Sequence, residues 1–135
     1  SMTGTRPGGA IAAAWAVMTY LGEAGYLERT KQTLAYLRRW WDAIEAIDGL
    51  EVMGEPVMGV FAVTSQTLDI FAIGQGMEER GWLVFADSEP VPSLRFMQSP
   101  GHEPYVEAYM ADLREIAEEV RRGERGEVAG RARYT

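Results

Sequence analysis

The chain contains no cysteine, a single lysine and a single histidine among its 135 residues. Without cysteine there can be no disulfide, no thiolate metal ligand and no cysteine nucleophile. One histidine is too few for a three-ligand site built from histidine and cysteine, so a metal would need carboxylate ligands alone. The composition therefore excludes several common classes of active site before any motif is considered.

The few groups that could carry catalysis stand in unsuitable surroundings. His102 lies between Pro100 and Pro104, a context that favours a turn and a helix start, so we expect it to cap or to form a surface hydrogen bond. Lys31 lies mid-helix beside an apolar stripe, where its amine should be protonated and in solvent. The last helix is expected to present a solvated acidic face of Glu115, Glu118 and Glu119. We predict no catalytic residue and no metal ligand.

Positive charge is also scarce, because acidic residues exceed basic ones and the net charge is −7. This charge makes nucleic acid or an anionic membrane an unsuitable partner. No apolar run reaches the ~20 residues needed to span a bilayer, and the N-terminus lacks the basic-then-apolar order of a signal peptide. We therefore expect a cytoplasmic protein with no transmembrane segment, in which Ser1 and Met2 are an expression scar.

What the sequence does contain is a glycine-rich segment over residues 4–9, directly before an apolar helix over residues 10–21. Pro7 suits the first turn of a helix, and Thr3 or Thr5 can act as its N-cap. Free backbone amides, a hydroxyl and an arginine at a helix N-terminus suit a phosphate group. The same residues fit a capped helix entry with no ligand, so the physics alone leaves both interpretations open.

The helix over residues 10–21 is apolar on all sides, which requires burial against a large partner. Gly22 and Gly25 then predict a corner or kink. From Tyr26 an amphipathic helix is predicted to run to Gly49, where glycine can take the left-handed conformation. Its predicted buried stripe is Leu27, Thr30, Leu34, Leu37, Trp41 and Ile44.

The remainder of the chain alternates short strands with helices. Strands are predicted over 50–54, 57–65, 82–85 and 93–97, and helices over 69–81 and 103–120. Asp69 or Thr67 should cap the first of these helices, and Gly81 should end it. The last helix has one apolar face, made of Val106, Tyr109, Met110, Leu113, Ile116, Ala117 and Val120. This order favours an α+β fold, a small antiparallel or mixed sheet with helices on one face.

Several short signatures also recur in one register along the chain. They are Gly4-Thr5-Arg6-Pro7-Gly8-Gly9, Tyr20-Leu21-Gly22-Glu23-Ala24-Gly25-Tyr26, Ile47-Asp48-Gly49-Leu50, Gly54-Glu55-Pro56, Leu68-Asp69-Ile70-Phe71 and Glu79-Arg80-Gly81-Trp82. Over about residues 3 to 120 the chain resembles the C-terminal domain of pyridoxal-phosphate-dependent group II decarboxylases. Within that family it is most similar to the sphingosine-1-phosphate lyase branch.

The resemblance implies the C-terminal small domain of a fold-type-I pyridoxal-phosphate enzyme, with the large domain upstream and missing. Residues 3–25 would be the interdomain connecting helix, residues 26–120 the small domain, and residues 121–135 a polar, disordered tail. It further implies a homodimer in which Gly4, Thr5 and Arg6 approach the cofactor phosphate of the neighbouring subunit.

For activity, the resemblance implies a pyridoxal-phosphate-dependent lyase or decarboxylase acting on a small amino acid or phosphorylated amino alcohol. The chain alone is expected to be inactive and to bind no cofactor. Pro7 and residues 95–98 depart from the family's usual residues, which leaves open whether the parent decarboxylates or cleaves an aldol-type bond. The alternative is a stand-alone, non-enzymatic α+β module for oligomerisation or small-anion binding.

Overall fold

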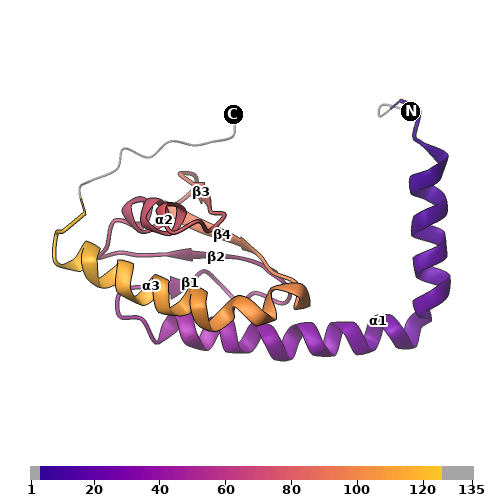
Figure 1. The fold of residues 1–135 in the computed structure, drawn as a ribbon, viewed down its shortest axis with the longest axis horizontal. Coiled ribbons are helices and arrows are strands. Elements are labelled where there is room, and N and C mark those ends of the chain that lie inside the picture. Colours follow the sequence, from indigo (N-terminus) through magenta and orange to yellow (C-terminus); the bar gives the residue numbers. More distant parts are fainter. Residues whose placement is uncertain (1–3, 126–135) are drawn as a thin grey trace. The chain divides into compact units, whose positions relative to one another are not determined.

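The computed structural model describes residues 4–125, which form two compact units with their boundary between Gln32 and Thr33 (Figure 1). The predicted scar at Ser1 and Met2, and the part of the predicted tail over 126–135, lie outside the described residues. The elements are α1 (Gly8–Glu45), β1 (Glu51–Val52), β2 (Val60–Thr64), α2 (Ile70–Glu79), β3 (Phe85–Asp87), β4 (Ser93–Met97), the 3₁₀ helix η1 (Pro100–Tyr105) and α3 (Val106–Arg121).

Helix α1 is interrupted at Gly22, whose φ of 57° and ψ of −175° are not helical. This combination is open almost only to glycine, so the predicted kink between the two helical segments is confirmed. The helix ends at Glu45, a few residues before the predicted end, and the chain then turns through Gly49 at a φ of 86°. A left-handed glycine therefore does stop this segment, one turn beyond the last helical residue.

The buried face of α1 differs from the predicted stripe. Its buried residues are Thr33, Tyr36, Leu37, Trp40 and Ile44. Leu27 is 53% exposed, and Trp41 is only partly buried. The prediction was therefore wrong for Leu27, whereas Trp41 still packs against the core. The adjacent Trp40 is the more deeply buried of the two tryptophans, and its ring lies 5.8 Å from that of Phe96 between centroids.

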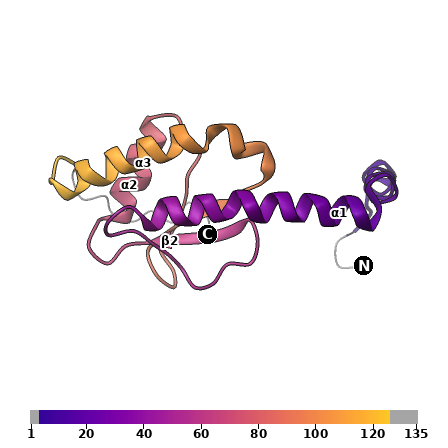
Figure 2. The same cartoon turned by 90° about the horizontal axis from the view of Figure 1, so that it is seen from below.

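The sheet has the strand order β1-β2-β4-β3, and every pair is antiparallel. The core lies on one of its faces, where Phe61 and Phe96 stack at 4.9 Å and Val63 pairs with Leu94. The 33–45 part of α1, α2 and α3 gather around this sheet (Figures 1 and 2). The predicted α+β class and the antiparallel form of the sheet are confirmed.

Strand β3 lies later in the chain than predicted. The sequence predicted a strand over residues 82–85, whereas the ladder begins at Phe85 and runs to Asp87. Trp82 is tied to the helices instead, because its backbone N–H donates to Met77 O and its indole N–H donates to Asp112. The predicted strands over 50–54 and 57–65 are also shorter, while the strand over 93–97 is confirmed in full.

Helices α2 and α3 follow the sequence pattern closely. The Asp69 carboxylate accepts hydrogen bonds from the amides of Phe71 and Ala72, at 2.9 and 3.2 Å, as an N-cap. Gly81 follows α2 with a φ of 90°. The apolar face predicted for the last helix is buried or partly buried, although its first turn is the 3₁₀ helix η1 and not α-helix.

Candidate functional site

The segment predicted to approach a phosphate precedes the first turn of α1. Gly4, Thr5 and Arg6 are all exposed, and the helix begins at Gly8, directly after Pro7. A Cβ built on Gly8 would meet no atom within 4 Å, so this end of the helix is open. The Thr5 hydroxyl and the Arg6 guanidinium are therefore exposed at this end of the helix, where a ligand from outside this chain could reach them. Their contact with a cofactor phosphate stays a prediction.

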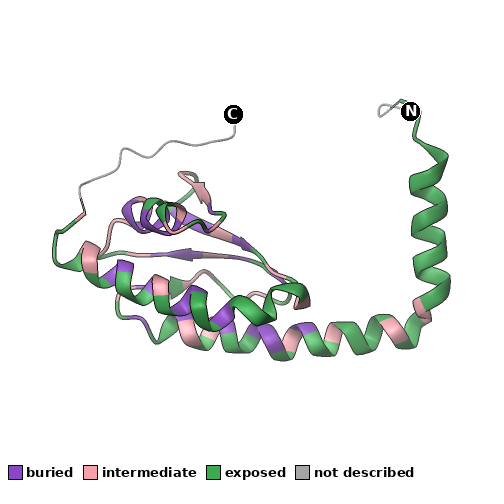
Figure 3. Cartoon of the chain, in the orientation of Figure 1, coloured by how far each residue is buried: buried purple, intermediate pink, exposed green. Residues whose placement is uncertain are grey.

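The helical segment that follows exposes large apolar side chains. These are Ile11, Trp15, Val17, Met18 and Tyr20. Figure 3 shows this part of α1 as exposed, whereas buried residues are concentrated after residue 32. A helix with this composition is normally buried against another surface.

The single lysine and the single histidine lie where the sequence predicts. Lys31 is exposed in the middle of α1. The Ser99 backbone N–H donates to His102 Nδ1 at 3.1 Å, so the histidine closes the first turn of η1. Both predictions are confirmed, and neither residue stands in a setting that activates it for catalysis.

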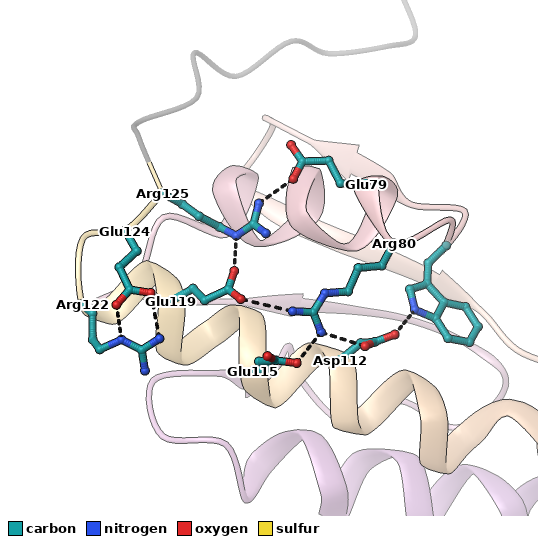
Figure 4. A network of polar contacts seen from close by, with 9 residues as sticks. Glu79, Arg80, Asp112, Glu115, Glu119, Arg122, Glu124 and Arg125 are labelled. Carbon is teal, nitrogen blue, oxygen red and sulfur yellow. Dashed lines mark hydrogen bonds and ion pairs between the residues drawn. The ribbon is translucent and has the colours of Figure 1, made fainter.

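Arg80 is the centre of an ion network between the end of α2 and one side of α3 (Figure 4). Its guanidinium lies 2.7 Å from Asp112 and Glu115 and 3.1 Å from Glu119. The hydrogen bond from the Trp82 indole, and then the Arg80 guanidinium, hold the pKa of Asp112 below its ordinary value. The same carboxylates raise the pKa of Arg80.

This network corrects the prediction of a solvated acidic face for Glu119, whose side chain is 20% exposed, whereas Glu115 and Glu118 stay 66% and 54% exposed, as predicted. Glu115 and Glu119 are paired with arginine, and Glu119 also binds Arg125 at 2.6 Å. Arg125 reaches Glu79 as well, so the start of the predicted disordered tail is anchored by ion pairs. The spacing of Asp112, Glu115 and Glu119 places them on one helix face, which is the signal that sequence reasoning could have used.

A second feature, which sequence reasoning missed, is a pocket of about 180 Å³ in the 33–125 unit. It lies beside β3 and β4, between the sheet edge and the start of α3. Its aromatic lining is Trp40, Trp82, Phe85, Phe96, Tyr105 and Tyr109. Because these residues are scattered over seventy positions of the sequence, no local pattern indicates the pocket.

The comparisons with known proteins cover nearly the whole chain. The sphingosine-1-phosphate lyase of Arabidopsis thaliana is 36% identical over 121 residues, which is 90% of this chain and 22% of that lyase. The structure of the sphingosine-1-phosphate lyase of Burkholderia pseudomallei matches with a TM-score of 0.78 at 33% identity, covering 88% of this chain and 27% of that one. The homologues of the present chain are therefore sphingosine-1-phosphate lyases.

Group II decarboxylases are homologues as well, as the resemblance predicted. The L-aspartate decarboxylase of Thermococcus kodakarensis is 31% identical over 118 residues, which is 87% of this chain and 29% of that enzyme. No protein-family model matches the chain. The chain thus spans less than a third of the length of these lyases and decarboxylases.

The residues present fit only part of a pyridoxal-phosphate site of the kind used by such enzymes. The donors at residues 4–6 suit a dianionic phosphate at a helix N-terminus. Lys31 does not suit the cofactor's aldehyde, since it is exposed in the middle of α1, whereas a lysine that bonds a cofactor lies in desolvated surroundings. Among residues 4–125 no three acidic or histidine side chains gather as metal ligands, and no helix is long and apolar enough to cross a membrane.

Proposed function

We propose that this chain is the C-terminal small domain of a pyridoxal-phosphate-dependent carbon–carbon lyase of the sphingosine-1-phosphate lyase type. The observation that carries the proposal is the continuous similarity over 90% of the chain, confined to 22% of the Arabidopsis lyase. In this proposal residues 3–25 connect to a large domain that lies upstream, and residues 26–120 form the small domain. Residues 121–135 are the tail.

Residues 4–6 bind the phosphate of the cofactor in the neighbouring subunit of a homodimer. Three residues of this short segment would face the phosphate: Gly4 through its backbone, Thr5 through its hydroxyl and Arg6 through its guanidinium. A helix N-terminus adds a favourable electrostatic potential for the dianion. When bound, the cofactor supplies the electron sink for a carbanion at Cα of the substrate. The role of this chain's residues is to hold and orient the phosphate.

The 135-residue chain is inactive without the large domain and holds no cofactor by itself, because its one lysine is an exposed side chain. A lysine that bonds the cofactor must be desolvated so that its amine is neutral. We propose that the complete enzyme is cytoplasmic. Its substrate is a phosphorylated amino alcohol or, as in the decarboxylase homologue, an amino acid, and the higher identity to the lyases favours the amino alcohol.

The test uses the longer polypeptide encoded by the reading frame that contains this chain. Thr5→Ala and Arg6→Ala should each weaken cofactor binding by about 10-fold or more, since a hydrogen bond to a charged group contributes about 1.5–3 kcal/mol. Cofactor affinity is measured by dialysis and absorbance, and Thr5→Ser should restore most of it.

The matched control is Arg114→Ala, which removes another exposed arginine, on α3. It should leave cofactor affinity unchanged. Equal cofactor affinity in the wild type, Thr5→Ala and Arg6→Ala would refute the phosphate contact. A natural reading frame that starts at Met2 with no upstream domain would refute the lyase proposal itself.

A further inference from the structure

The pocket beside β3 and β4 is formed by rings that hold one another in place. Tyr109 is one of its lining residues, with Trp82 at 5.0 Å and Phe96 at 5.8 Å between ring centroids, both edge to face. Trp40 packs against the same tyrosine at 5.0 Å. Because these contacts fix the side chains without a ligand, the pocket is preformed.

Two nitrogen atoms of this pocket's lining, the indole Nε1 of Trp40 and Nε of Arg95, are buried without a hydrogen-bond partner within residues 4–125, and Tyr109 lines the same pocket. Trp40 is 2% exposed, and its indole N–H donates to no described acceptor. Tyr109 is 7% exposed, its hydroxyl has no described partner, and burial raises its pKa, so it stays a neutral O–H donor. Buried donors without acceptors are rare, because each one costs free energy of about 1–3 kcal/mol.

The other polar groups of the lining are also donors. Gln98 Oε1 accepts the Tyr36 hydroxyl at 3.0 Å, which leaves the Gln98 amide N–H groups. His102 Nδ1 is occupied by the Ser99 amide, so the neutral ring carries its proton on Nε2. The Arg95 guanidinium lies 3.2 Å from Asp87, and its charge is therefore compensated. The lining therefore favours a ligand that carries a hydrogen-bond acceptor, but it has no uncompensated positive charge that would favour an anion.

We propose that this pocket binds a small aromatic molecule that carries an uncharged carbonyl, with the ring among the aromatic side chains and the oxygen toward the buried donors. The size agrees, since a cavity of about 150 Å³ lined by apolar side chains takes up benzene. The pocket, at about 180 Å³, is somewhat larger and so leaves room for a one-ring ketone or amide. This site uses none of the residues 4–6 and is independent of the proposed cofactor chemistry.

The test titrates the full 135-residue chain with three probes of similar size and follows its amide resonances by NMR. Acetophenone has the ring and the carbonyl, ethylbenzene has the ring alone, and benzoate has a charged acceptor. Acetophenone should bind most tightly and shift resonances around Tyr109. Tyr109→Phe keeps the ring and removes the hydroxyl. It should lower the affinity for acetophenone by about 3- to 10-fold, the range expected for the loss of one hydrogen bond.

Ethylbenzene separates a lost hydrogen bond from a disturbed pocket. Its affinity should be the same for the wild type and Tyr109→Phe, because it never used the hydroxyl. Tyr20→Phe is the matched control, since this tyrosine is 88% exposed on the first segment of α1. The proposal is overturned if acetophenone fails to bind, if benzoate binds more tightly, or if Tyr109→Phe weakens both neutral probes equally.

Discussion

The two units of this chain use apolar residues in opposite ways. In the second unit, Leu37, Ile44 and Ile73 are completely buried in one core. In the first unit, every described residue from Gly4 to Tyr20 is exposed, including a tryptophan. The second unit therefore satisfies its own hydrophobic surface, whereas the first segment of α1 exposes a surface that needs another protein surface to cover it.

This contrast agrees with the coverage of the homologues. Residues 33–121 form a domain that buries its own core. The helices and strands of such a domain can be predicted from the spacing of apolar residues in the sequence. The helix before Gly22 is as apolar as a buried helix, yet its residues are exposed. We propose that a further domain, in the part of the lyases that this chain does not match, supplies the covering surface. The predictions below test the contrast between the two units, beginning with the largest effect.

Two tryptophans give the sharpest comparison. Trp40→Ala removes a side chain that is 2% exposed, and it should lower the free energy of unfolding by about 3–5 kcal/mol through a lost apolar contact and a cavity. Trp15→Ala, at 66% exposure, should change it by less than about 0.5 kcal/mol. Urea unfolding followed by far-ultraviolet circular dichroism measures both. Similar losses for the two variants would contradict the division of the chain.

The ion network should make the next largest contribution within the second unit. Arg80→Ala leaves Asp112, Glu115 and Glu119 facing one another without their shared cation. We expect a loss of about 1–2 kcal/mol, more than for one exposed pair, because several partly buried carboxylates depend on it. Arg114→Ala on α3 is the control and should be near neutral. The free energy of unfolding should change less between low and high salt in Arg80→Ala than in the wild type.

Acid should weaken the same network in a defined direction. The Trp82 indole and Arg80 lower the pKa of Asp112 in the folded protein. Its contribution to stability is therefore complete above about pH 4, the ordinary pKa of aspartate, and is lost as the pH falls through the lowered value. Trp82→Phe removes the indole N–H, so unfolding midpoints measured between neutral and acid pH should fall less steeply than in the wild type. An equally steep fall would show that another carboxylate dominates.

The smallest effect on stability is expected at the kink of α1. Gly22→Ala forces a residue with a Cβ out of the conformation at a φ of 57° and into helical geometry. The free energy of unfolding should change by less than about 0.5 kcal/mol, since no core contact is involved. Because the chain has no cysteine, labels at Ala12→Cys and Lys31→Cys can report the distance across Gly22. That distance should increase, and an unchanged distance would show that the kink does not depend on glycine.

Local chemistry explains which elements the sequence predicts well. Asp69 caps α2 through its own carboxylate, and Gly81 ends it with a positive φ, so both signals act within a few residues. The apolar face of α3 follows from helical periodicity alone. The kink at Gly22 and the turn at Gly49 are predictable for the same reason.

Tertiary contacts decide the features that the sequence does not reveal. Trp40 is preferred over Trp41 because its ring reaches Phe96 and Tyr109, which are distant in sequence. The Trp82 indole N–H donates to Asp112 on α3, and Trp82 therefore does not join the strand that was predicted over residues 82–85. The resemblance to lyases and decarboxylases could be recognised from the signatures and is confirmed by the homologues. The aromatic pocket depends on packing, and the role of residues 4–6 stays a prediction.

Amide hydrogen exchange on the 135-residue chain, read by mass spectrometry, tests the central claim most directly. The account predicts that the hydrogen-bonded amides of the buried helices and strands within residues 33–121 exchange only through global unfolding, while those of residues 8–21 exchange faster by orders of magnitude. Equal protection of the two segments would contradict it, because the first helix would then be stabilised by this chain and would need no covering domain.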